Sequence, residues 1–139
     1  MGERRKSREI ALQMLFSVDL GRMDCKTLRK DFLEELKEKP EIKVFAFELF
    51  EGTTANLEKI DKVINTRLKN WEFERLANVD KNILRFATYE LLFRADIPVA
   101  VTINEAIEIA KSFSGKEAGK FINGILDNIK KDIKIKKKE

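Results

Sequence analysis

Apolar residues recur at spacings of three and four along almost the whole chain, and this pattern limits the fold more than any other feature of the sequence. Residues at these spacings share one face of an α-helix. The broadest stripe comprises Ile83, Leu84, Ala87 and Leu91, widened by Phe86, Tyr89 and Phe93. No segment combines period-two alternation with the turn residues that are typical of strands. We therefore expect an all-α protein of about seven helices, with the helix around residues 80–93 at its centre.

Glycine, proline and capping residues predict where these helices begin and end. Gly21 and Gly115 are expected to end helices, because glycine readily adopts the left-handed backbone conformation found there. Asp80 is placed as an N-cap, and Thr102-Ile103-Asn104-Glu105 fits the S/T-x-x-E capping box. The expected helices lie, in chain order, at about residues 3–20, 28–36, 42–70 with a bend at 53–54, 80–93, 102–114 and 116–129.

One interruption of the helical pattern divides the chain. The segment Asn70-Trp71-Glu72-Phe73 breaks the longest apolar repeat. We therefore expect two small helical bundles packed together, an N-terminal one over residues 1–70 and a C-terminal one over residues 71–139.

Composition excludes several classes of protein. The chain has 139 residues, 43% hydrophobic and 37% charged, which suits a soluble globular fold. Apolar runs such as Leu91 to Phe93 fall far short of the roughly 20 residues that span a bilayer, and the basic N-terminus lacks the apolar core of a secretory signal. We therefore expect a cytoplasmic protein with no membrane segment. The chain has no histidine, and Cys25 is the only cysteine, so we expect no zinc site and no disulfide within the chain.

The sequence matches none of the catalytic motifs that its residues suggest. The segment from Gly115 to Lys120 differs from a phosphate-binding loop in its glycine spacing, has Phe121 in place of Ser or Thr, and follows no strand. Cys25 has no histidine to act as its base, and pairs of carboxylates such as Glu105 and Glu108 are typical of a solvated helix face. We therefore expect a binding protein without a cofactor rather than an enzyme.

Basic residues concentrate at the two ends of a chain whose net charge is +4. The N-terminal cluster consists of Arg4, Arg5, Lys6 and Arg8. Cations in the first turns of a helix are disfavoured by about 0.3–1 kcal/mol each, because the positive end of the helix dipole lies there. An anionic partner such as RNA or DNA would offset this, although a solvated helix start is the alternative. The lysine-rich segment 130–138 is interpreted as a solvated tail.

A second basic cluster lies where the last two expected helices meet. Its lysines are Lys111, Lys116 and Lys120, and Phe121 follows directly. At about 100° per residue, Phe121 lies roughly 90° from the centre of the last apolar stripe, so its ring either packs at the margin of the core or stacks on an unpaired base. Phe113 is a second candidate for stacking. Asn123 would either read a base edge or form a hydrogen bond within the junction.

Several motifs together resemble the NusB family of transcription antitermination factors. They are RRKSREIALQMLFS near the start, ILR and YELL on the central helix, and then INEAIE and KFINGILD. The resemblance implies two small helical bundles that bind single-stranded boxA-type RNA together with NusE, a ribosomal protein of the small subunit. It further implies an antitermination complex on RNA polymerase during ribosomal RNA synthesis, without a cofactor.

The same resemblance assigns roles by position within the matching motifs. The arginine-rich start and the region from Lys116 to Asn123 would bind RNA, and Glu74 and Asp80 would face NusE. Two alternatives stay open. NusB-like domains also occur as RNA-binding modules of RNA cytosine methyltransferases, but we expect a separate factor because the sequence has no Rossmann-like glycine-rich segment. Some family members self-associate, so a structural homodimer is the other alternative.

Overall fold

Helices form all the regular secondary structure in the described part of the chain. The computed structural model describes residues 2–21, 24–28, 33–68 and 72–136. Its helices are α1 (Gly2–Asp19), α2 (Cys25–Thr27), α3 (Leu33–Glu35), α4 (Pro40–Ala55), α5 (Leu57–Asn65), α6 (Glu72–Arg75), α7 (Asn78–Phe93), α8 (Val99–Ser114) and α9 (Lys116–Lys136). This confirms the predicted all-α class. Within these ranges, no helix is both long enough and apolar enough to cross a membrane.

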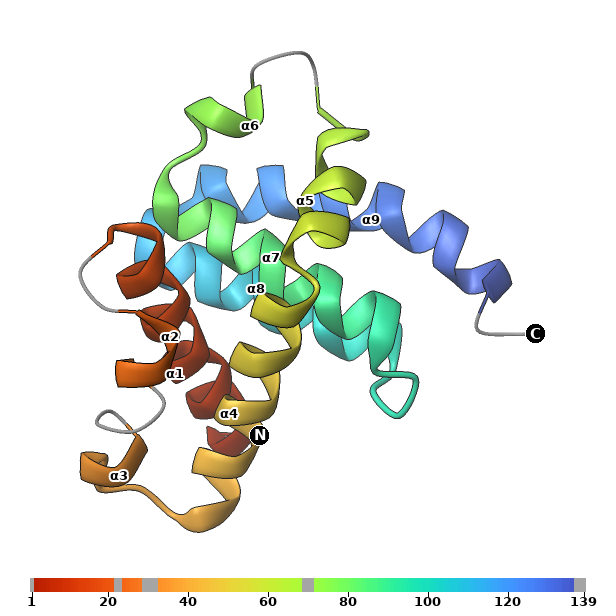
Figure 1. Cartoon of the computed structure of the whole chain (residues 1–139). Helices are drawn as coiled ribbons and strands as arrows, with labels where there is room; N and C mark the ends of the chain where they lie inside the picture. Colours follow the sequence, from red (N-terminus) through yellow and green to blue (C-terminus); the bar gives the residue numbers. More distant parts are fainter. Residues whose placement is uncertain (1, 22–23, 29–32, 69–71, 137–139) are drawn as a thin grey trace.

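Helix α7 is the centre of the fold, as its broad apolar stripe predicts. It packs against α1, α4, α5, α8 and α9 (Figure 1). Every residue from Lys81 to Thr88 is buried. The main core is continuous from the first helix to the last and includes Met14, Phe50, Ile60, Ile83, Ile109 and Leu126. The division predicted at residues 70 and 71 stays a prediction, because residues 69–71 lie outside the described ranges.

The predicted glycine stops are confirmed, whereas both predicted N-caps are wrong. Gly21 and Gly115 have φ values of 72° and 96°, which favour glycine. Helix α7 begins two residues before Asp80, since the Lys81 amide already donates to the Ala77 carbonyl at 2.9 Å. Asp80 therefore lies in the first turn, where its negative charge suits the helix dipole.

The residues of the predicted capping box bond elsewhere in the fold. Pro98 occupies the N-cap position of α8, so the helix begins before Thr102. The Thr102 hydroxyl donates to the Glu90 carboxylate at 2.7 Å, and the Glu105 carboxylate accepts hydrogen bonds from Arg5. The side chains of Thr102 and Glu105 therefore bond to other helices instead of capping the start of α8.

The long helix predicted over residues 42–70 is two helices, α4 and α5, that meet at Asn56. The Gly52 carbonyl accepts hydrogen bonds from both the backbone amide and the side-chain amide of Asn56, at 3.2 and 2.8 Å, which closes the end of α4. Gly52 also permits close packing of α7, because a Cβ added there would lie 2.1 Å from Cζ of Tyr89. Of the helix predicted near residues 28–36, residues 29–32 lie outside the described ranges.

Candidate nucleic-acid interface

The first turn of α1 presents cations, and most of them already have partners within the protein. The Arg4 guanidinium lies 4.2 Å from the centroid of the Phe45 ring. Arg5 binds both carboxylate oxygens of Glu105, at 3.1 and 2.6 Å. The hydrogen bond with Glu105 is the main cause of the raised pKa of Arg5, so the guanidinium stays charged. Lys6 pairs with Glu38 at 2.8 Å.

The side chain of Arg8, which the sequence predicts to contact RNA, is buried in the structure. The guanidinium donates to both oxygens of Glu90, at 2.7 and 2.9 Å, and neither side chain is more than 2% exposed. Glu90 also accepts the Thr102 hydroxyl, so one carboxylate joins α1, α7 and α8. The cations at the start of α1 are therefore compensated largely within the fold, and their position alone no longer requires an anionic partner. Glu90 and Glu105 hold this helix in place, whereas the sequence pattern assigns Glu105 to a helix cap and a solvated face and does not single out Glu90.

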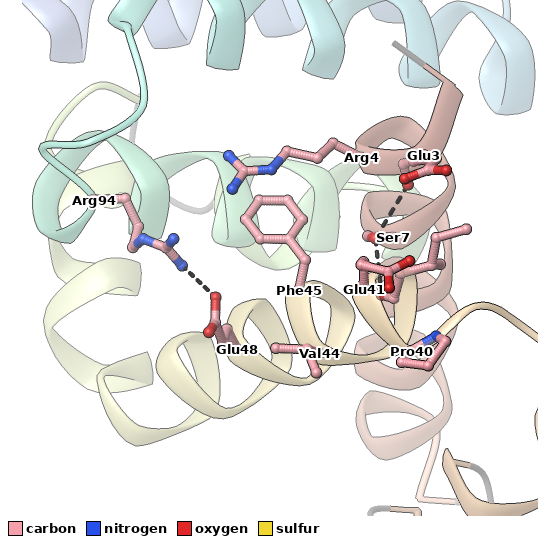
Figure 2. Close-up of a pocket in the computed structure, with 10 residues that line it drawn as sticks. Glu3, Arg4, Ser7, Pro40, Glu41, Val44, Phe45, Glu48 and Arg94 are labelled. Atoms are coloured by element: carbon pink, nitrogen blue, oxygen red, sulfur yellow. Dashed lines mark hydrogen bonds and ion pairs between the residues drawn. The ribbon is translucent and has the colours of Figure 1, made fainter.

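The hollow beside Arg4 is a poor site for a phosphate. It has a volume of about 520 Å³, with Phe45 and Arg94 also in its lining (Figure 2). Arg94 is occupied by Glu48 and Asp96, each at 3.0 Å, and its hydrogen bond is the main cause that lowers the pKa of Asp96 to about 2. Three carboxylates line the hollow, those of Glu3, Glu41 and Glu48. Their charge would repel an anion.

The junction between α8 and α9 brings together the second predicted cluster. Gly115 turns the chain, and its amide donates to the Lys111 carbonyl at 3.1 Å. A Cβ added at Gly119 would lie 2.6 Å from Cγ of Lys111, so the stem of this lysine crosses the start of α9. The glycines thus bring Lys111 close to the helix that carries Lys116 and Lys120.

The charges of this junction are accessible. Lys111 pairs with Glu108 at 3.2 Å and Lys120 with Glu117 at 3.8 Å, and all four side chains are exposed. Exposed pairs three residues apart on a helix contribute about 0.2–0.5 kcal/mol, so a phosphate could replace the carboxylate at little loss. Lys116 is exposed and makes no ion pair with the described residues. All three lysines are therefore available to an anion.

The aromatic and amide side chains of the junction differ in exposure. The Phe121 ring is half-buried and packs against the main core, as its helical phase predicts. Phe113 is 47% exposed, and Asn123 is exposed as well. The margin position leaves part of the Phe121 ring open to a ligand, so packing and stacking are compatible.

Two further predicted residues lie at the same end of the bundle. Helices α7 and α8 run antiparallel, so the start of α7 and the end of α8 are neighbours (Figure 1). Glu74 on α6 is exposed, and Asp80 in the first turn of α7 is half-buried. One carboxylate oxygen of Asp80 is buried without a hydrogen-bond partner among the described residues. The residues expected to face NusE thus lie on the end of the bundle that carries the lysines.

The described part of the chain is helical and carries a basic junction. Among the described residues, no group of three or more His, Cys, Asp and Glu side chains could hold a metal ion. The helices and the basic junction define a small all-helical protein with a surface suited to anions. Residues 5–131 match the NusB family. The chain belongs to this family, whose members are transcription antitermination factors and not enzymes.

Individual relatives cover nearly the whole chain. The transcription antitermination protein NusB of Thermodesulfovibrio yellowstonii is 46% identical over 140 residues, with 94% of this chain and 93% of that protein covered. NusB of Bacillus pumilus is 45% identical, with 95% and 98% covered.

Solved structures agree with the fold. NusB of T. maritima has a TM-score of 0.83 and 43% identity, with 93% of this chain and 91% of that chain covered. A chain from the crystal structure of the antitermination factors NusB and NusE in complex with dsRNA has a TM-score of 0.83 and 29% identity, with 95% and 98% covered.

Proposed function

We propose that this protein binds single-stranded boxA-type RNA at the α8–α9 junction, together with NusE. The observation that carries the proposal is the meeting of three exposed lysines with an aromatic ring at the margin of the core. Lysines bind phosphates in a salt-dependent way, and an aromatic ring stacks on an unpaired base for about 1–3 kcal/mol. The bases of a duplex are already stacked on each other, so an exposed aromatic ring favours a single strand.

The family and one solved neighbour support the choice of partners. That neighbour contains NusB, NusE and double-stranded RNA in one complex, so it supports NusE and RNA as partners, and the single strand rests on the aromatic rings of the junction. In this protein, the exposed Glu74 and the half-buried Asp80 would contact NusE. The assembly would join an antitermination complex on RNA polymerase and support processive transcription of ribosomal RNA operons. With a nascent transcript and a ribosomal protein as its partners, the protein would act in the cytoplasm.

The N-terminal cations have a smaller part in this proposal than the sequence suggests. The Arg5 side chain is 36% exposed and pairs with Glu105. Glu105 lies on α8, six residues before Lys111. Six residues span about 9 Å along a helix, so a strand bound at the junction could extend to Arg5 and Arg4. Lys6, which pairs with Glu38, would contact only a longer RNA.

Loss of the junction lysines is expected to weaken binding to RNA more than loss of other lysines on the same helix. Each phosphate contact contributes about 0.7 to the slope of log affinity against log salt for a single strand, so Lys116→Ala with Lys120→Ala should reduce the slope by about 1.4. The matched control is Lys130→Ala with Lys131→Ala, which removes the same charge near the other end of α9. Fluorescence titration of a boxA oligonucleotide at several salt concentrations measures both. Equal losses in the two double variants would contradict the assigned site.

A further inference from the structure

A groove at the other end of α9 has the features of a binding site for a protein helix. It lies between α5, the end of α7 and the second half of α9, and its volume is about 400 Å³. We define it as the basic groove, with Val63, Leu92, Ile129 and Ile133 along its apolar part and Lys59 and Lys62 at its rim. A shallower hollow continues along α5 and shares both lysines.

The floor of the basic groove is aliphatic. Ile129 and Ile133 are 1% and 3% exposed and belong to the main core, and Val63 and Leu92 pack against them at partial exposure. The open part of this aliphatic surface therefore belongs to Val63 and Leu92, and covering it with another apolar side chain gains free energy. The groove therefore suits a ligand with apolar side chains.

The rim of the basic groove carries an excess of positive charge. Its lining contains three cations, Lys59, Lys62 and Arg67. It contains one carboxylate, that of Asp132, which pairs with Arg67. The Lys59 ammonium lies 5.3 Å from the centroid of the Phe93 ring, and no described carboxylate pairs with it or with Lys62. Glu58 lines only the adjoining hollow. A ligand with carboxylates beside its apolar side chains would complement this rim.

We propose that the basic groove binds an acidic amphipathic helix of a partner protein. Such a helix presents apolar residues at spacings of three and four to a groove and keeps its charges at the edges. The chain's own C-terminal segment, KIKKKE, has the wrong charge to fill the groove. RNA fits less well, because the floor is aliphatic and the nearby Phe93 ring already stacks with Tyr89 and contacts Lys59.

This site is separate from the proposed RNA interface. Lys116 and Ile133 lie 17 residues apart on α9, which corresponds to about 25 Å along the helix axis. A ligand in the groove therefore leaves the junction accessible, and each site can be tested without the other.

Fluorescence anisotropy of a labelled acidic amphipathic peptide tests the proposal on the full chain. The probe has about 18 residues, five helical turns, with Leu and Phe at positions i, i+3, i+4 and i+7 and Glu or Asp elsewhere. A peptide of the same composition, permuted to remove the helical spacing, is the reference. We expect saturable binding of the amphipathic peptide and at least a fivefold weaker binding of the permuted one.

Charge reversal at the rim identifies the groove as the site. Lys59→Glu with Lys62→Glu is expected to weaken peptide binding about tenfold, because two attractive contacts become repulsive. The control, Lys37→Glu with Lys43→Glu, makes the same change of net charge on the α3–α4 side and should leave binding unchanged. Circular dichroism checks that both variants fold. The proposal is overturned by absent binding, by equal binding of the permuted peptide, by equal effects of the two variants, or by a groove that binds single-stranded RNA in place of the peptide.

Discussion

Replacing Glu90 with alanine is expected to lower the free energy of unfolding by about 3–5 kcal/mol, a large part of the 5–15 kcal/mol typical of a domain. The substitution removes both hydrogen bonds of the buried Arg8 guanidinium, which keeps only the more distant Glu105 carboxylate at 3.7 Å, and it removes the acceptor of the Thr102 hydroxyl. A buried charge that loses its hydrogen-bonded partner is far less stable than the same charge in water. Urea denaturation followed by circular dichroism measures the change.

Two further variants separate the buried pair from ordinary surface charges. Glu48→Ala removes an exposed partner of Arg94, which keeps Asp96, so its effect should stay below about 1 kcal/mol. Replacing both buried charges, with Arg8→Met and Glu90→Leu, should recover most of the loss, because neither charge is then left alone. An effect of Glu90→Ala no larger than that of Glu48→Ala would show that the pair does not hold α1 in place.

The Phe121→Ala variant is expected to weaken binding to boxA RNA by about 1–3 kcal/mol, or roughly 5- to 150-fold, through the loss of a stacked base. The slope of affinity against salt should not change, because no charge is removed. Since the ring is only half-buried, we expect the free energy of unfolding to fall by less than the 3–5 kcal/mol that is common for a fully buried phenylalanine. Titration of RNA and denaturation in urea measure the two effects on the same sample.

The neighbouring aromatic residue provides the comparison for Phe121. Phe113 is more exposed and is not among the residues that pack against the main core. Phe113→Ala should therefore leave stability nearly unchanged and weaken RNA binding less than Phe121→Ala. A loss of 3–5 kcal/mol in stability for Phe121→Ala, with unchanged RNA affinity, would assign the ring to the core alone.

Features of the fold that depend on local spacing could be predicted from the sequence. The stripe on α7 indicates its central position because burial on several sides requires apolar residues on several faces. Gly21 and Gly115 indicate helix ends because their positive φ angles favour a residue without a Cβ. The phase of Phe121 along α9 likewise predicts the margin of the core, where the structure places it.

Features that depend on distant partners could not be predicted. Arg8 belongs by sequence to an exposed basic cluster, yet its partner Glu90 lies 82 residues away. Thr102 and Glu105 match a local capping motif but bond to α7 and α1. No spacing rule within one helix reports such pairs, and the sequence therefore overestimates how many N-terminal cations face solvent.

Titration of boxA RNA with this protein, in the presence and absence of NusE, tests the central claim most directly. If the α8–α9 junction and NusE bind one RNA strand together, NusE should raise the affinity at least about fivefold, a coupling of about 1 kcal/mol. The Lys116→Ala, Lys120→Ala variant should lose affinity for RNA in both conditions. No enhancement by NusE, together with equal RNA affinity of the native protein and this variant, would contradict the proposed function.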